Sequence, residues 1–284
     1  LTVKILLGTA QFDKNYGISR SNKEFNFNQK KLLIKFARQN QIEGLDTAAV
    51  YKNAETELGK IGVNDFKIIS KLPKLKKNAK VRTQILSALK LSLNKLKLKR
   101  IYGILIHDLK DLNGSNKDEY LDELKNLKRL NLVKKIGISL YDVNDIKKII
   151  KYWKPDIIQI PFNIFDRRLN NKIICKIIKK NKIEVHARSI FLQGILTKRN
   201  KKKRFNKWKK LFDAWFNWCN KNNMQPYEVA YLYAKNNNII NKIVIGFENF
   251  DQLKKIIKIK KKIRKFPDLE CKDEMLINPF NWNK

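Results

Sequence analysis

Short apolar runs alternate with longer amphipathic segments along the whole chain, and this alternation limits the fold more than any other feature. The runs are rich in Ile and Val and are flanked by polar residues, as expected for strands that are buried on both faces. There are eight of them: Ile5–Ala10, Gly44–Ala48, Lys67–Lys71, Ile101–His107, Lys135–Ser139, Ile157–Ile160, Ile183–Ser189 and Ile243–Gly246.

Segments with helical periodicity lie between these runs. In Asn28–Gln41, for example, Leu32, Leu33, Phe36 and Ala37 form one apolar stripe. The other predicted helices are Ala54–Ile61, Lys80–Leu96, Lys117–Leu132, Val143–Tyr152, Asn170–Lys180, Phe205–Cys219, Gln225–Lys235 and Phe250–Lys262.

Eight strands that are each followed by a helix predict an α/β fold, a single closed eight-stranded parallel (β/α) TIM barrel. An open, doubly wound sheet is the competing architecture. Its dinucleotide-binding form needs a G-x-G-x-x-G turn after an early strand, and none of the ten glycines here forms even a G-x-G. The chain has no linker rich in Ser or Pro, so we expect one domain over residues 1–284.

The chain is strongly basic, with 63 Lys and Arg against 26 Asp and Glu and a formal net charge of +37. This charge raises nucleic acids and acidic membranes as partners. However, 43% of the residues are hydrophobic, which is too many for a disordered basic tail. We expect no specific nucleic-acid partner, only weak and salt-sensitive affinity. No apolar run approaches the roughly 18–20 residues of a membrane span, so no membrane partner is expected.

Cysteine and histidine are scarce. Cys175, Cys219 and Cys271 are an odd number without C-x-x-C spacing, which argues against a disulfide framework and for a reducing, cytoplasmic location. With only two histidines, a transition-metal site is not expected either. The chain has no P-loop, no H-E-x-x-H and no G-x-S-x-G motif.

Polar and titratable residues stand where the predicted strands end. In a barrel of this kind the active site lies at the carboxyl ends of the strands, so these side chains are expected to converge on one cavity. They are Asp46, Lys71, His107, Ser139, Gln159, Arg188, Ser189 and Gly246, with Tyr51 in the loop after the second strand. His186 alternates with Arg188 on the same strand face as Glu184, and we assign it a structural role.

Several motifs carry a family resemblance. Gly44-Leu-Asp46-Thr-Ala-Ala-Val-Tyr51 leads into Glu55 and Gly59, and it is followed by Ser70-Lys71-Leu-Pro73 and Leu105-Ile-His107-Asp. Similar phrases occur nearly end to end: Gly8-Thr-Ala-Gln11, Tyr16-Gly-Ile, Gly137-Ile-Ser139, Gln159 to Asn163, Asp166-Arg167, Arg188 to Gly194, Ile245 to Asn249, Gln252-Leu253 and Ile277 to Trp282. The sequence thereby resembles the aldo-keto reductase superfamily, and most of all bacterial members found among sugar and cell-surface polysaccharide genes.

The resemblance implies a catalytic set of four residues: Tyr51 as the general acid, Lys71 as the group that tunes it, Asp46 as the ion partner of Lys71, and His107 as a hydrogen-bonder that orients the carbonyl. Reducing a carbonyl builds negative charge on its oxygen, so a proton donor must stand beside it. A tyrosine of pKa about 10 is protonated at neutral pH. A nearby ammonium is expected to lower that pKa and ease donation.

The resemblance also implies a nicotinamide dinucleotide cofactor. It assigns Ser139 and Gln159 to the nicotinamide amide, and Arg188 to a place where many relatives stack an aromatic ring; a planar guanidinium can stack too. The remaining residues assigned to the cofactor are Gly8, Thr9, Asp46, Ser189, Phe191, Leu192, Gln193, Gly194, Gly246, Asn249 and Gln252. Gln252 stands where NADPH-preferring relatives commonly have Arg, but Lys254 and Lys255 can still meet a 2′-phosphate. We expect NADP, with NAD as the alternative.

The resulting hypothesis is an NAD(P)H-dependent reductase of an aldehyde or ketone, with a sugar derivative as one candidate substrate. A dinucleotide-binding regulatory subunit without turnover is the rival interpretation, and a non-specific nucleic-acid binder is a weaker one. The basic cluster Lys198–Lys210 is interpreted first as a solvated loop and second as an attractor for cofactor phosphates. The loop Asp13–Asn28 and the tail Phe266–Lys284 are expected to wall the pocket. The sequence leaves the oligomeric state open.

Overall fold

The fold is known from a computed structural model, which describes residues 3–12, 25–76, 80–114, 116–199, 203–247 and 249–283. Most of the predicted pocket loop Asp13–Asn28 lies outside the described residues, as do Lys201 and Lys202 of the basic cluster and Tyr16 of the family motifs.

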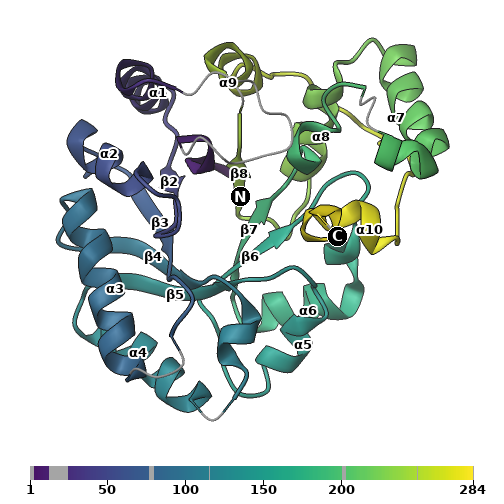
Figure 1. Ribbon diagram of the computed structural model, residues 1–284. Coiled ribbons are helices and arrows are strands. Elements are labelled where there is room, and N and C mark those ends of the chain that lie inside the picture. The colour runs from purple at the N-terminus through teal and green to yellow at the C-terminus, as the bar shows by residue number, and fades with distance from the viewer. Residues whose placement is uncertain are drawn as a thin grey trace.

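Eight parallel strands form a closed barrel at the centre of the molecule, and helices surround it (Figure 1). Each strand pairs with the next along the chain, and β1 closes the barrel against β8. The strands are β1 (Lys4–Gly8), β2 (Gly44–Asp46), β3 (Lys67–Lys71), β4 (Ile101–Ile106), β5 (Val133–Ser139), β6 (Ile157–Pro161), β7 (Glu184–Arg188) and β8 (Lys242–Ile245). The predicted TIM barrel is confirmed, with each strand within a few residues of its predicted position.

The helices that follow the strands are α1 (Phe27–Gln39), α2 (Ala54–Ile61), α3 (Val81–Leu96), α4 (Lys117–Arg129), α5 (Asp145–Ile149), α6 (Lys172–Lys180), α7 (Lys209–Lys221), α8 (Pro226–Lys235), α9 (Phe250–Ile257) and α10 (Glu274–Ile277). Several are shorter than predicted, α5 and α9 by the most. Helix α5 begins at Asp145 because Asn144 and Asp142 form a side-chain-bonded turn before it, and α9 ends at Ile257.

The charge of the chain lies mainly outside the core. In α6, Ile174 and Ile178 are buried against the barrel, whereas Lys172, Lys176 and Lys179 are exposed. Inside the barrel, Leu6, Ile69, Leu105 and Ile157 form a separate, fully buried cluster. The excess of lysine is therefore compatible with an apolar interior of the barrel.

An ionic cluster fills the end of the barrel where the strands begin. Nε2 of His186 lies 2.6 Å from Oε1 of Glu184, and the hydroxyl of Tyr102 donates to Oε2 of Glu184 at 2.7 Å. Nζ of Lys242 lies 3.3 Å from Glu184 and 2.7 Å from Glu43. His186 is fully buried, and this burial lowers its pKa. These contacts agree with the structural role predicted for His186.

Candidate active site

A buried ion pair joins the ends of β2 and β3. Nζ of Lys71 lies 2.7 Å from Oδ1 of Asp46, and the two side chains are only 3% and 6% exposed. The same ammonium donates a second hydrogen bond to the carbonyl oxygen of Thr47, at 3.0 Å. Parallel pairing of β2 and β3 places both residues at the carboxyl end of the barrel. The structure thus joins these two residues as predicted.

The second carboxylate oxygen of Asp46 accepts a hydrogen bond from a residue on the opposite side of the barrel. Nε2 of Gln159, on β6, donates to Oδ2 of Asp46 at 2.6 Å. Thr9, just after β1, is fully buried, and its hydroxyl donates a hydrogen bond to the backbone carbonyl oxygen of Asp46 at 3.1 Å. Gln159 and Thr9, both expected at the cofactor, therefore hold Asp46 in this structure. Ser139 is paired in register with Gln159 on the neighbouring strand.

Tyr51 lies in the turn between β2 and α2, with its ring packed against the core. The centre of the ring is 5.8 Å from Nζ of Lys71. The pKa of Tyr51 is raised above its ordinary value, first by burial and then by the negative charge of Asp46. The expected lowering of the Tyr51 pKa is therefore wrong for this structure, because burial of the ring and the charge of Asp46 outweigh the nearby positive charge. The positive charge that acts to lower the pKa of Tyr51 is Arg188.

His107 directly follows β4 and is partly buried. Burial, together with the positive charges of Lys71 and Arg188, lowers the pKa of His107 to about 4. The imidazole is therefore neutral at neutral pH and has one N–H to donate. Tyr51 and His107 therefore both lie near the Asp46–Lys71 pair: the Tyr51 ring is 5.8 Å from Lys71, and His107 follows the end of β4, the strand that pairs with β3.

Arg188, the last residue of β7, packs on an aromatic ring that the sequence analysis missed. Its guanidinium carbon lies 4.6 Å from the centre of the Tyr141 ring. Nη2 donates to the carbonyl oxygen of Leu140 at 3.0 Å, and Nη1 donates to Oγ of Ser189 at 3.4 Å. Tyr141 comes two residues after Ser139, and this position just past a strand end was the signal that could have identified it.

The turn after β7 has an unusual backbone. Leu192, Gln193 and Gly194 all have positive φ, at 45°, 50° and 89°, as does Ser189 at 58°. The side chains of Phe191 and Leu192 are buried in the core. These two residues can therefore offer a ligand little more than their backbone, while Gln193 and Gly194 are partly exposed.

Four further residues expected at the cofactor, Gly8, Gly246, Asn249 and Gln252, lie near the ends of β1 and β8. A Cβ added to Gly246 would lie 2.8 Å from Nε2 of Gln11, so the glycine lets that amide approach the backbone. Oδ1 of Asn249 accepts a hydrogen bond from the backbone N–H of Gln252 at 2.9 Å and thereby caps the N-terminus of α9. A Cβ added to Gly8 would lie 3.2 Å from the backbone carbonyl oxygen of Ile245, so Gly8 packs closely against that group.

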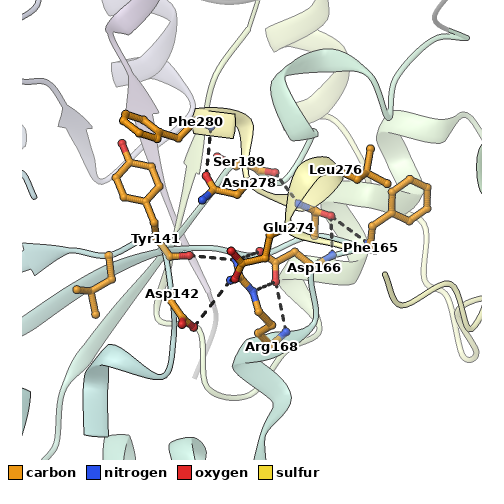
Figure 2. Close-up of polar contacts among 12 residues, drawn as sticks. Tyr141, Asp142, Phe165, Asp166, Arg168, Ser189, Glu274, Leu276, Asn278 and Phe280 are labelled. Carbon is orange, nitrogen blue, oxygen red and sulfur yellow. Dashed lines mark hydrogen bonds and ion pairs between the residues drawn. The ribbon is translucent and has the colours of Figure 1, made fainter. Parts of the chain in front are cut away.

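Arg168, another residue that sequence reasoning missed, attaches the C-terminal tail to the carboxyl end of the barrel. Nη2 of Arg168 lies 2.8 Å from Oδ2 of the fully buried Asp166, and Nη1 lies 3.5 Å from Oε1 of Glu274 in α10 (Figure 2). Nη2 also donates to the Tyr141 carbonyl oxygen at 3.0 Å. The Phe280 ring lies 5.7 Å from that of Tyr141. The tail therefore lies against Tyr141, just past the carboxyl end of β5, and its role as a wall of the substrate pocket stays a prediction.

The described part of the basic cluster Lys198–Lys210 is partly neutralised by acids. Arg199 lies 2.6 Å and Lys209 lies 3.4 Å from Asp213, and Lys207 lies 2.8 Å from Asp273. The Arg204 guanidinium donates to the Trp282 carbonyl oxygen at 2.8 Å. These contacts fit the interpretation of a solvated loop that is attached to its neighbours.

A closed barrel with titratable side chains at the carboxyl ends of its strands defines the class of (β/α)-barrel enzymes. Among known structures, an aldo-keto reductase from Bacillus halodurans in its holo form is similar, with 18% identity, a TM-score of 0.71 and coverage of 90% of this chain and 86% of that chain. Glycerol dehydrogenase from Gluconobacter oxydans is also similar, with 20% identity, a TM-score of 0.65 and 90% coverage of both chains. At these identities the likeness establishes the fold. No curated protein sequence matches the chain.

The family model of the Aldo/keto reductase family matches residues 4–272, so the chain belongs to that family. It is an oxidoreductase of a family that reduces carbonyl groups with NAD(P)H. Within the described residues, no helix is long and apolar enough to cross a membrane, and no group of three His, Cys, Asp or Glu side chains is arranged to hold a metal ion.

Proposed function

We propose that this protein reduces an aldehyde or ketone to an alcohol, with Tyr51 as the group that protonates the carbonyl oxygen. The observation that carries the proposal is the buried Asp46–Lys71 pair beside Tyr51, in which each oxygen of Asp46 accepts a hydrogen bond. A buried ammonium needs a partner to keep its charge. Asp46 supplies that partner and fixes Lys71 next to the Tyr51 ring.

Two hydrogen-bond donors are proposed to meet the carbonyl oxygen. The raised pKa of Tyr51 keeps its hydroxyl protonated, so it has a proton to give. The lowered pKa of His107 keeps its imidazole neutral, so its N–H orients the carbonyl without competing as an acid. Negative charge that develops on the oxygen is then close to Lys71 and Arg188, which stabilise it.

The residues present fit a nicotinamide dinucleotide, which supplies the hydride when it is bound. Oε1 of Gln11 is buried without a hydrogen-bond partner among the described residues, and it lies beside Gly246 at the end of β8. We propose that Ser139, Gln159 and the turn Phe191–Gly194 also contact the cofactor. For Gln159 this would mean sharing its amide with Asp46.

We propose NADP as the cofactor, with NAD as the alternative. Lys255, in α9, is exposed, and no partner for it is found in the part of the chain that the structure describes. Nζ of Lys254 lies 3.9 Å from Asp251 and packs over the Phe250 ring. Quenching of tryptophan fluorescence by NADPH and by NADH measures the preference, and tighter binding of NADPH that weakens in Lys255→Gln supports the proposal.

The experiment that tests the function mixes the protein, NADPH and a panel of aldehydes and ketones, sugar derivatives included, and follows the absorbance of the reduced nicotinamide. Turnover that is lost in Tyr51→Phe supports the enzyme. A matched control is Tyr152→Phe, which removes a hydroxyl from an exposed tyrosine after α5. Dinucleotide binding without turnover over the whole panel would instead favour a regulatory subunit.

We further propose that the chain forms one domain, acts in the cytoplasm and has no specific nucleic-acid partner. Cys175, Cys219 and Cys271 are all free thiols, which suits a reducing compartment. Sequence-selective DNA binding near physiological salt would contradict the last of these proposals.

A further inference from the structure

We propose that Arg188 binds an anionic group of the carbonyl substrate, so that the enzyme prefers substrates bearing a carboxylate or a phosphate. This inference rests on the function proposed above and names the substrate class for the same cavity. It is carried by the position of Arg188, by the lack of an acidic partner for its charge among the described residues, and by the contrast with the neighbouring arginines.

Arg188 ends β7, at the same carboxyl end of the closed parallel barrel as the groups proposed to meet the carbonyl. Its positive charge acts on both Tyr51 and His107, which come from the β2 and β4 ends of the barrel. The guanidinium lies over Tyr141, whose ring contacts Phe280 of the tail. A substrate whose carbonyl meets Tyr51 and His107 would therefore extend toward a cation beside an aromatic wall.

In the part of the chain that the structure describes, the partners of Arg188 are all neutral. Its two hydrogen bonds go to a backbone carbonyl oxygen and a serine hydroxyl, and the second is long at 3.4 Å. A guanidinium carries five N–H donors. Within the described ranges, no carboxylate forms an ion pair with Arg188, although the residue is partly buried.

Two neighbouring arginines at the same end of the barrel form ion pairs with acidic side chains. Arg168 is surrounded by Asp166, Asp142 and Glu274, and Arg167 lies 2.9 Å from Asp268. Lys71 is paired with Asp46, and His107 is neutral. Arg188 is thus the uncompensated charge among the side chains that we place at the reacting carbonyl.

A partly buried cation without a counter-ion is costly, and this cost is relieved when an anion binds. The planar fork of a guanidinium suits the two oxygens of a carboxylate or phosphate. Contact with the nicotinamide would use a face of the guanidinium, whereas an anion would use its in-plane N–H donors. The two roles are therefore compatible.

The test compares 4-carboxybenzaldehyde and 4-formylphenyl phosphate with the neutral methyl 4-formylbenzoate, at saturating NADPH. We expect kcat/KM of the wild-type enzyme to favour at least one anion by about tenfold to a hundredfold, the range for hydrogen bonds to a charged group. The preferred anion shows whether carboxylate or phosphate is recognised. The ratio of anionic to neutral substrate should collapse in Arg188→Gln and survive in part in Arg188→Lys.

The matched control is Arg129→Gln, which removes an exposed arginine at the end of α4 and should leave the ratio unchanged. Because the readout is a ratio, a general loss of cofactor binding in Arg188→Gln cancels. Equal ratios in wild type and Arg188→Gln, or a wild-type preference for the ester, would overturn the inference while leaving the proposed function intact.

If no aldehyde is reduced at all, the proposed function fails and the anion site is tested by binding alone. Calorimetric titration with benzoate, phenyl phosphate and neutral benzamide then compares the wild type with Arg188→Gln, after circular dichroism has confirmed that the variant folds. Anion-selective binding that disappears in the variant supports the site. Binding that is absent or unchanged contradicts it.

Discussion

Nε2 of Gln159 donates to Oδ2 of Asp46 at 2.6 Å, and this bond connects two strands that lie on opposite sides of the barrel. With Lys71 on Oδ1, both oxygens of a buried carboxylate are occupied before any ligand binds. The amide of Gln159 is thus a structural partner of Asp46 as well as a candidate contact for the cofactor.

Replacing Gln159 by Leu should destabilise the protein, because Oδ2 of Asp46 would remain buried without its donor. We expect the free energy of unfolding to fall by about 1–3 kcal/mol, the cost of an unsatisfied buried polar group. Urea denaturation measures this change. Gln39→Leu, on the exposed face of α1, is the control and should change stability by less than about 0.5 kcal/mol. Equal effects of the two substitutions would contradict the prediction.

Replacing Lys71 by Met should cost more, about 3–5 kcal/mol, since it leaves the Asp46 carboxylate buried without a counter-charge. The double variant Asp46→Asn with Lys71→Met should recover part of that loss. A double-mutant cycle on unfolding free energies isolates the pair. Strictly additive effects of the two substitutions would show that the ion pair contributes nothing to the fold.

Acidification should destabilise the protein in part through His107. Its pKa is about 4 in the folded chain and about 6.5 in a free imidazole, so the unfolded chain binds more protons between these pH values. Stability should therefore be constant above about pH 6.5 and fall as the pH drops toward 4. The slope should be smaller in His107→Gln, and His186, whose pKa is also lowered, accounts for part of the remainder.

The lowered pKa of His107 also predicts how the activity depends on pH. Since His107 is already neutral, kcat/KM for carbonyl reduction should show no inflection near pH 6.5. Steady-state rates between pH 5.5 and 9 measure this. An inflection near pH 6.5 that disappears in His107→Gln would mean that His107 titrates near its ordinary pKa in the free enzyme, which would contradict the prediction.

Removal of Arg168 should release the C-terminal tail. In Arg168→Gln the buried Asp166 loses its ion partner, and α10 loses the contact through Glu274. Hydrogen exchange of the amides in residues 274–283 should become faster. Glu274→Gln, which removes only the 3.5 Å contact, should have a smaller effect. Unchanged exchange in Arg168→Gln would show that the ring contacts of Phe280 with Tyr141 and of Trp282 with Phe205 are enough to hold the tail.

The barrel was predictable because apolar runs at nearly even spacing report directly on strands that are buried on both faces. The meeting of Asp46, Lys71 and Tyr51 followed from barrel geometry, since strand ends converge. The direction of the pKa shift of Tyr51 did not follow, because it depends first on how deeply the fold buries the ring and then on the charge of Asp46. The Arg168 network was equally out of reach, since Arg168 and Glu274 are 106 residues apart and no periodicity links them.

The chain has only two histidines, and Asp46 acts on both. His107 belongs to the cavity, whereas His186 is sealed in the ionic cluster at the other end of the barrel. In a magnetic resonance spectrum of protein labelled at histidine, the two imidazoles would therefore act as built-in reporters on either side of one carboxylate. A change in charge at Asp46 would move both signals, and a ligand held only by the outer cavity would move the signal of His107 alone.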